Sequence, residues 1–290
     1  MKVGYVSTNY SIGCDADKTL RLSSLLPDKV LKVSLSNLEC LRKILAWNLE
    51  HGITFFRISS NTVPFASHPK LNLDWRRELQ HVLGEIGDFV REHSMRISMH
   101  PGQFVVINSH RDDVVRSSLE ELMYHADLLD LMGLRDAHVQ IHVGSSKGGK
   151  AQSLDRFIHT YQQLPENVKS KLVIENDDRI FNVKDCLELS SRIKIPVVLD
   201  NLHHSLNNSG ESFIEAFEKV RLTWTERPML DYSEQERGAK PGVHASTLSE
   251  DNFAKFAEGL DGVDVMLEVK DKEKSALKAV RILREMGKLE

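Results

Sequence analysis

The sequence has few cysteines and no long apolar run. Cys14, Cys40 and Cys186 are widely spaced over 290 residues and form no CxxC pair. This odd, scattered set argues against a secreted disulfide framework, so we expect reduced, buried thiols and a cytoplasmic protein. The chain starts without the long apolar run of a signal peptide and contains no apolar stretch that could cross a bilayer. We therefore expect no association with membranes.

A strong charge of one sign is also missing. The chain has 38 Lys and Arg against 42 Asp and Glu, a formal net charge of −4. This balance excludes a global basic field for binding nucleic acid, although a local basic groove remains compatible with it. With 41% hydrophobic and 28% charged residues, the composition is that of an ordered protein with one sizeable core.

Short apolar runs alternate with longer segments of helical period. The runs cover residues 2–6, 53–59, 96–100, 138–143, 171–175, 196–200, 227–233 and 263–269. Helical spacing of apolar residues predicts helices over 36–52, 114–133, 153–164 and 272–287. Ser36 or Asn37 is expected to cap the first of these helices.

Roughly eight strands that alternate with helices, in a chain near the typical ~250 residues, predict a TIM-type parallel (β/α)8 barrel. We expect a single catalytic domain over residues 1–290. A doubly wound open sheet is the alternative, but no glycine-rich dinucleotide turn follows the first run. Residues 62–75 and 233–247 are expected to form long loops after the second and seventh strands.

Each apolar run from the third onward has an acidic residue or a histidine near its carboxyl end. These residues and their close followers are His100, His142, Glu175, Asp200, His203, His204, Asp231, His244 and Glu268. In a parallel barrel the carboxyl ends of the strands meet on one face, where active sites are built. Any one of these residues is ordinarily a helix cap or a satisfied polar group, but six strands in series indicate a shared site.

So many carboxylates in one place would repel one another unless cations neutralise them. Imidazole together with carboxylate suits zinc, manganese or iron. The donors outnumber the four to six ligands of a single ion, so two or three ions are expected. Such a cluster suits phosphodiester hydrolysis, and it suits sugar isomerisation as well.

Several longer motifs resemble those of the UV damage endonucleases, relatives of endonuclease IV. The motifs are "GYVSTN", "FRISSNTVPFASHP", "MHPGQFVVINS", "QIHVG" with "GGK", "VIENDD", "VLDNLHH", "RPMLDYSEQ" and "DVMLEVKDKE", in order along nearly the whole chain. The resemblance implies a barrel enzyme that nicks duplex DNA immediately 5′ of cyclobutane pyrimidine dimers and (6-4) photoproducts, with abasic sites as a further candidate. The products would be a 3′-hydroxyl and a 5′-phosphate.

The resemblance also implies a set of ligands for two or three divalent ions. Manganese is favoured, with zinc, cobalt or magnesium as alternatives. Glu175 and Glu268 would bridge ions. The remaining ligands would divide into His100 with His142, Asp200 with Asp231, and His203 with His244. Glu175 would also orient the attacking water, because an ion-bound water with a pKa near ~7 needs no separate protein base.

Two positions depart from the family pattern. Met229 stands where the family usually has a lysine, often carboxylated, and Asp231 stands where it has a histidine. An aspartate can still ligate a metal as a harder oxygen donor, whereas a methionine binds hard ions poorly. We therefore expect this protein to function without a modified lysine and with an altered metal preference or lesion range.

The residues expected at the DNA lie on the same barrel face. A damaged base pair is more easily extruded from the stack, and Gln103 and Phe104 can fill the gap by hydrogen bonding and stacking. In the family a tyrosine usually stands at the position of Phe104; the alternative is that "FVV" anchors a loop. Further candidates for contacting bases or phosphates are Tyr5, Asn9, Arg57, Ser59, His68, Lys147, Lys150 and Lys270.

Several of these candidates have an equally ordinary interpretation. A core tyrosine and a turn asparagine explain Tyr5 and Asn9, and a solvated loop explains Lys147 and Lys150. Lys270, which we expect to bind phosphate or stabilise the leaving oxygen, is otherwise a surface lysine.

Two other functions fit the same residues. A sugar isomerase or epimerase of the same superfamily would use the same face and two metals, but it would need no protruding Gln103–Phe104 turn. A metal-binding scaffold or an inactive DNA-binding protein is the second alternative. The expected partner is damaged double-stranded DNA, bound by a monomer that needs no obligate protein partner.

Overall fold

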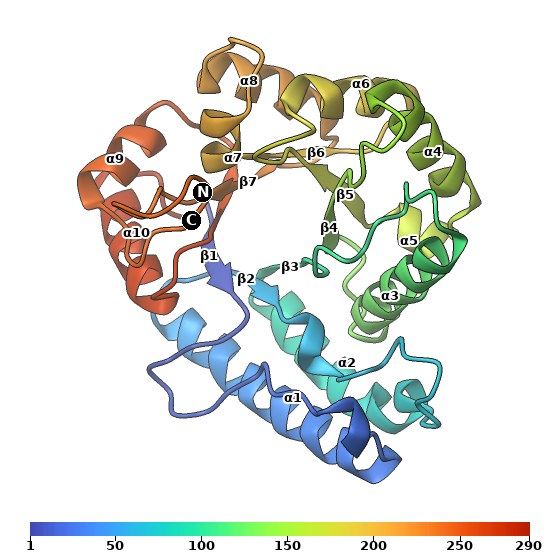
Figure 1. Ribbon diagram of the computed structural model, residues 1–290. Helices are drawn as coiled ribbons and strands as arrows, with labels where there is room; N and C mark the ends of the chain where they lie inside the picture. The colour runs from blue at the N-terminus through green and yellow to red at the C-terminus, as the bar shows by residue number, and fades with distance from the viewer.

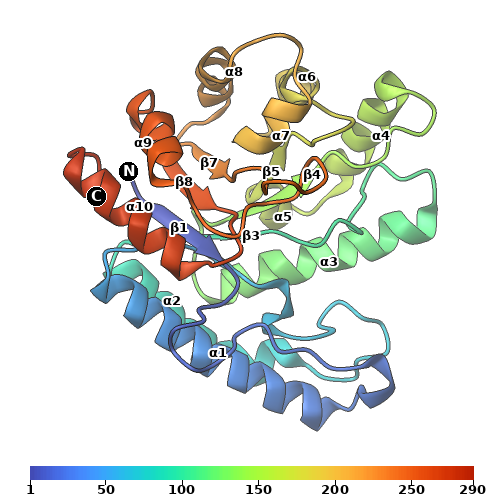
Figure 2. The ribbon, with the colours of Figure 1, turned by 60° about the vertical axis from the view of Figure 1, so that its left-hand side comes forward.

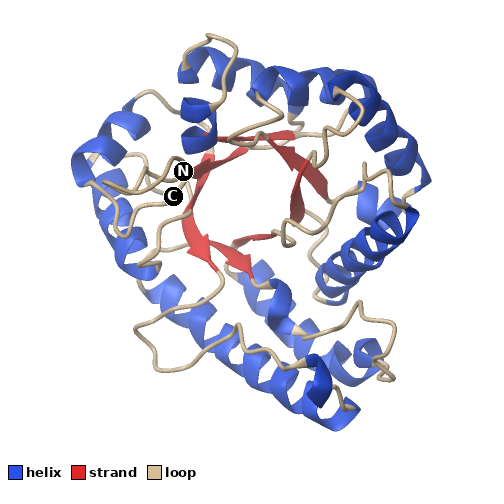
Figure 3. Cartoon of the chain, in the orientation of Figure 1, coloured by secondary structure: helices blue, strands red, loops and turns tan.

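Eight parallel strands close into a barrel in the computed structural model, which describes residues 1–290. The strands are β1 (Val3–Val6), β2 (Phe55–Ile58), β3 (Arg96–Met99), β4 (His138–His142), β5 (Leu172–Glu175), β6 (Val197–Asp200), β7 (Met229–Tyr232) and β8 (Asp264–Leu267). Each strand pairs with the next in sequence, and β1 pairs with β8 to complete the ring (Figures 1 and 3). The predicted TIM-type barrel is therefore confirmed.

Helices form the outer ring around this barrel (Figure 3). They are α1 (Pro27–Glu50), α2 (Trp75–Glu92), α3 (Asp112–Leu131), α4 (Lys150–Gln163), α5 (Glu166–Lys169), α6 (Val183–Ile193), α7 (Asn201–Leu206), α8 (Phe213–Val220), α9 (Glu250–Glu258) and α10 (Glu273–Glu285). The turned view shows α1, α2 and α3 side by side and α10 against β1 (Figure 2). Their apolar faces and the outer faces of the strands share one buried cluster of 65 residues. No helix is long and apolar enough to span a membrane.

The first helix differs from its prediction. The spacing predicted a start at Ser36 or Asn37, but α1 begins at Pro27, which occupies the first turn. Proline suits that position because its missing N–H needs no partner there. Asn37 is instead buried, and its amide donates to the carbonyls of Lys18 and Asn61, both at 2.9 Å. A polar residue that joins two loops was thus mistaken for a helix cap.

Alternate residues of each strand point into the barrel, and they form layers. An apolar layer contains Phe55, Val173, Val198, Met229 and Met266, all buried in one cluster. A polar layer follows one step further along the same strands, because Arg57, Glu175, Asp200, Asp231 and Glu268 each lie two residues later in the chain. The apolar layer thus closes the barrel directly beneath the polar one.

The chain ends meet at one side of the barrel. The amino group of Met1 donates to the carbonyl of Lys288 at 2.8 Å, and the N–H of Glu290 donates to the carbonyl of Met1 at 3.1 Å. Gly4 of β1 allows the adjacent strand to come close, because a Cβ there would lie 2.2 Å from the carbonyl oxygen of Phe55. These contacts hold β1 in the ring that positions the polar layer.

Candidate metal centre

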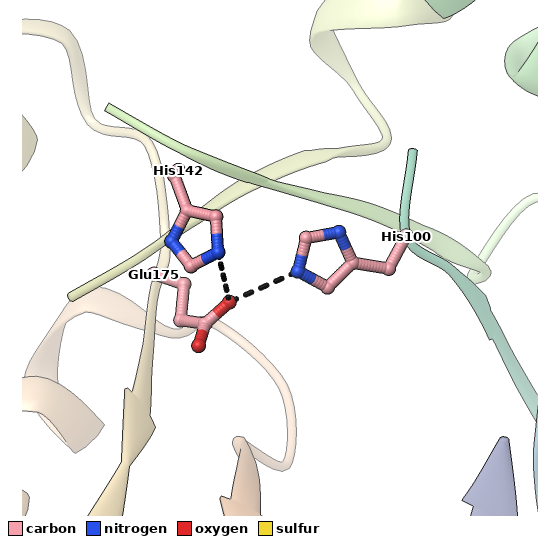
Figure 4. A group of neighbouring side chains, drawn as sticks. All are labelled: His100, His142 and Glu175. Atoms are coloured by element: carbon pink, nitrogen blue, oxygen red, sulfur yellow. Dashed lines mark hydrogen bonds and ion pairs between the residues drawn. The ribbon is translucent and has the colours of Figure 1, made fainter. Parts of the chain in front are cut away.

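Glu175 is the centre of the polar layer. It ends β5, and it is 1% exposed. Two imidazoles face one of its oxygens: His100 Nε2 lies 3.1 Å and His142 Nε2 lies 3.6 Å from Oε2 (Figure 4). His142 ends β4 and is paired with Glu175 in the β4–β5 register, and His100 directly follows β3.

A second group of donors shares Glu175 from the other side. Nδ1 of His203 lies 2.9 Å from Oε1 of Glu175 and 3.7 Å from Oδ1 of Asp200. His203 lies on α7, which starts directly after β6, and the Asp200 side chain caps this helix by accepting from the backbone N–H of His203. The cap and the imidazole together fix the position of the second group.

Each of these two groups can hold a metal ion. In His100–His142–Glu175 and in Glu175–Asp200–His203, one donor atom from each residue lies within 4.8 Å of the other two. Oδ2 of Asp200 is buried without a hydrogen-bond partner. Buried polar atoms are seldom left unpaired, and imidazole with carboxylate is a usual donor set for divalent transition metals. The residues present therefore fit the ions that the sequence predicted.

The remaining expected ligands are arranged differently. Asp231 and Glu268 both bind the guanidinium of Arg57, Asp231 at 2.7 Å. His244 lies on the loop between β7 and α9, with its Nδ1 3.7 Å from a Glu268 carboxylate oxygen. These residues border the two groups but form no third group of metal donors.

The charges of the layer shift the pKa values of its members. Burial acts to raise the pKa of Glu175, but His142, His100 and His203 outweigh it and hold this pKa well below the usual range. Burial raises the pKa of Asp200 well above its usual range, and burial also raises that of Asp231 to about 7, against the opposing effect of Arg57. For His203, the carboxylates of Asp200 and Glu175 overcome burial and raise the pKa to about 11. Such divergent shifts in one cluster are typical of functional sites.

The comparisons with known proteins agree with this geometry. The sequence profile of the family described as UV-endonuclease UvdE matches residues 1–290. The chain belongs to this family. A UV DNA damage endonuclease of Clostridium perfringens is 35% identical over 296 residues, which cover 99% of this chain and 72% of that protein. A UV DNA damage endonuclease of Halalkalibacterium halodurans is 34% identical, and the match covers 90% of this chain and 84% of that protein.

Solved structures of the same barrel fold superpose on this chain. The crystal structure of SacUVDE is 63% identical and superposes with a TM-score of 0.99 over the whole of both chains. Endonuclease IV of Thermus thermophilus superposes with a TM-score of 0.58 at 16% identity, covering 85% of this chain and 94% of its own. D-psicose 3-epimerase of Clostridium cellulolyticum superposes with a TM-score of 0.59 at 11% identity. The match covers 100% of this chain and 99% of the epimerase. The last two likenesses show the barrel fold alone.

Among the residues expected at the DNA, Gln103 and Phe104 lie on an exposed turn after β3. Phe104 is 67% exposed, more than any other phenylalanine of the protein. The turn separates two cavities: one of about 780 Å³ is lined by Phe104, and one of about 570 Å³ is lined by Gln103. His100 lines both cavities, so each of them reaches the candidate metal centre.

Three of the residues expected to contact DNA are buried. Tyr5 is 0% and Asn9 is 1% exposed. The Tyr5 hydroxyl donates to Asn48 of α1 at 2.6 Å and accepts from Asn9 at 2.9 Å, because this side chain points out of the barrel toward the helices. Arg57 is 3% exposed and points inward to Asp231. Tyr5 and Asn9 line neither cavity, whereas Arg57 lines the larger one, so the contact expected of Arg57 stays a prediction.

The other expected contacts lie at or near the rim of this face. Ser59 is 7% exposed and its hydroxyl donates to Asp17, while His68 lines the larger cavity. Lys147 approaches His110 at 2.8 Å, and Lys150 forms an ion pair with Asp185 at 2.5 Å. Lys270 is half exposed and lies 3.5 Å from Glu236 rather than over the buried carboxylates.

Two residues of the site were missed from the sequence. Gln140 is fully buried, and its amide donates to Glu175 at 2.7 Å and to Asp231. It precedes His142 by two positions, so the alternation of β4 already predicted an inward direction. Lys272 follows β8 with φ of 54°, a left-handed conformation that is costly for lysine. Burial lowers the pKa of Lys272, against the raising effect of Glu268 and Asp17.

Proposed function

We propose that this protein is a metal-dependent endonuclease that nicks duplex DNA immediately 5′ of UV photolesions. Its substrates are cyclobutane pyrimidine dimers and (6-4) photoproducts, with abasic sites as a further candidate, and its products carry a 3′-hydroxyl and a 5′-phosphate. The observation that carries the proposal is that two donor groups share Glu175 on the face where Phe104 protrudes. Membership of the UV-endonuclease family supports it.

The ions would be held by His100 and His142 with Glu175, and by Glu175 with Asp200 and His203. When bound, divalent ions, with manganese favoured, supply charge stabilisation to phosphate oxygens and lower the pKa of water. Glu175 keeps its negative charge because three imidazoles hold its pKa low, so it can accept a hydrogen bond from the attacking water. Lys270 at the rim and the more buried Lys272 are the cations available for the scissile phosphate and the leaving oxygen.

Lesion recognition is assigned to the exposed turn between the two cavities. A damaged dinucleotide is extruded from the stack at lower cost than an intact one. Phe104 then stacks in the gap while Gln103 bonds to the bases left unpaired. The cavities on either side, of about 780 and 570 Å³, offer room for extruded bases beside His100. A small-sugar epimerase would have no use for an exposed aromatic residue at this position.

The test is a nicking assay on an end-labelled duplex that contains one thymine dimer. Undamaged and abasic duplexes serve as controls, each with manganese and with EDTA. We expect a single cut immediately 5′ of the dimer, only with the metal, from a protein that elutes as a monomer. If no damaged duplex is cut in manganese, magnesium, zinc or cobalt, the proposal is wrong and conversion of ketohexoses becomes the next assay.

A further inference from the structure

Arg57 lies inside the barrel as a fixed cation between two carboxylates. Its Nη2 donates to Oδ1 of Asp231 at 2.7 Å, and its Nη1 donates to Glu268. The side chain of Arg57 is 4% exposed and that of Asp231 is 0% exposed. An ion pair at this depth is screened little by water. Separating its charges would be costly, because each would be left buried without hydration.

Neutral partners hold the guanidinium in this position. Nη2 also donates to the amide oxygen of Gln140 at 2.9 Å, and Nε lies 3.4 Å from Ser98 Oγ. Gln140 in turn donates to Glu175, the carboxylate shared by both donor groups. Arg57 is thereby connected to the candidate metal centre through one side chain. Its planar fork is matched by acceptors on β3, β4 and β7 and by Glu268, directly after β8.

The surroundings provide no further ligand on this side of the centre. Met229, which stands directly below Asp231 on β7, is 0% exposed within the apolar layer. It belongs to the same apolar cluster as Phe55 and Met266, so this layer offers neither a carboxylated lysine nor a polar donor from beneath. The pair of Asp231 and Glu268 therefore has the Arg57 guanidinium as its positive partner.

The charge balance favours fewer ions than the acidic residues suggest. The layer contains four buried or nearly buried carboxylates, those of Glu175, Asp200, Asp231 and Glu268. When all four are ionised and the ligating imidazoles are neutral, Arg57 offsets one negative charge, and two divalent ions bring the sum of carboxylates, Arg57 and ions to about +1, which matches a phosphodiester. A third ion would leave about +3 in a buried site, which is costly.

We propose that the Arg57 guanidinium takes the place of one ion at Asp231 and Glu268, so that the centre holds two divalent ions. The two ions belong to the groups that share Glu175, and His244 is left outside their ligand set. This inference rests on the proposed metal dependence of the enzyme. It concerns how many ions bind and where, and it does not depend on the lesion that is cut.

The experiment counts metal ions in the whole protein after saturation with manganese and removal of free metal. Mass spectrometry of the metal content gives ions per chain for the wild type, for Arg57→Met and for Arg57→Lys. We expect two ions in the wild type and in Arg57→Lys, and about three in Arg57→Met, because Asp231 and Glu268 then lack a cation. Manganese should also raise the Tm of Arg57→Met by more than that of the wild type.

Arg96 provides the matched control. It is another arginine of the barrel interior, at the opposite end of β3, and it pairs with Asp264 at 2.9 Å. Arg96→Met should retain two ions. Three ions in the wild type, or two in a folded Arg57→Met, would overturn the inference. If Arg57→Met does not fold, the wild type and Arg57→Lys decide, since three ions in either one contradict it.

These outcomes are separate from those of the nicking assay. A protein that binds two ions and fails to cut damaged DNA would retain this inference and lose the proposed function. A protein that cuts damaged DNA with three bound ions would retain the function and lose the inference.

Discussion

At the scale of single residues, the site is organised by shared side chains. Glu175 belongs to both donor groups, and Gln140 connects it to Asp231 and Arg57. A change at a shared residue should therefore disturb more than one ligand set. The exposed Phe104 is separate from this network and can be altered without touching it.

Glu175→Ala should reduce cleavage of a dimer-containing duplex by at least about 10²-fold, because both donor groups lose a ligand and the attacking water loses its acceptor. Binding of damaged DNA should persist, since the exposed turn is unchanged. Single-turnover nicking and a gel-shift titration measure the two effects. Glu166→Ala, at a carboxylate that is 87% exposed on α5, is the control with unchanged cleavage. Nicking at the wild-type rate by Glu175→Ala would refute the site.

Phe104→Ala should weaken binding of a dimer-containing duplex by about 1–3 kcal/mol, roughly 5- to 150-fold, because one stacking interaction is lost. Metal content should stay the same. Fluorescence anisotropy with damaged and undamaged duplexes measures the difference. Leu222→Ala removes another exposed apolar side chain, 83% exposed and outside both cavities, and should have no effect. Equal losses of binding in the two variants would contradict the stacking role proposed for Phe104.

At the scale of elements, the loop after β1 is fastened to α1 by a disulfide between Cys14 and Cys40. This corrects the expectation of three reduced thiols, of which only Cys186 is free and buried. The spacing of 26 residues gave no sign of the pairing, because the two cysteines meet only through the packing of the loop on the helix. The same loop carries Asp17, which lines the larger cavity.

Cys14→Ser should lower the free energy of unfolding by about 2–4 kcal/mol under oxidising conditions, because the unfolded chain gains the freedom of an open loop. Urea unfolding with and without dithiothreitol measures the effect. The reductant should destabilise the wild type to the level of the variant and leave the variant unchanged. The Cys186→Ser variant should still be destabilised by dithiothreitol, as the wild type is. A wild type indifferent to dithiothreitol would show that the bond does not form in solution.

At the scale of the whole molecule, buried polar groups beneath the active face connect the barrel to its outer helices. His125 of α3 is fully buried. Its Nδ1 donates to the Glu121 carbonyl at 2.7 Å, and its Nε2 accepts from the Ser60 hydroxyl at 2.9 Å. Burial lowers the pKa of His125 to about 4. Its neutral form is thus part of the folded structure.

Because of His125, the free energy of unfolding should decrease as the pH is lowered. Between its unfolded pKa near ~6.5 and its folded pKa of about 4, the unfolded chain binds more protons than the folded one. The contribution is fully present above the unfolded value and falls by about 2 kcal/mol between pH 7 and pH 5. Urea unfolding in EDTA at both pH values should show a smaller loss for His125→Gln than for the wild type. The exposed His159→Gln should behave as the wild type, and an equal pH dependence in all three would contradict the assignment.

The sequence by itself determined the barrel and the kinds of donor at its active face. Apolar runs of strand length, each followed by a helix, define a parallel ring, and the residues at their carboxyl ends must then converge. That is why His100, His142, Glu175, Asp200 and His203 could be named without a structure. These features depend on local periodicity and on one topological rule, both of which a single chain displays.

Only the tertiary structure decided which charges meet inside the ring. Arg57 turns inward to Asp231, a partner that the sequence did not indicate, and Tyr5 turns outward to α1. The direction of each side chain depends on strand register and ring closure, and its partner comes from a strand or helix distant in the chain. Cys14 and Cys40 meet for the same reason. Contacts of this kind leave no periodic pattern in sequence, because they are set by packing across the core.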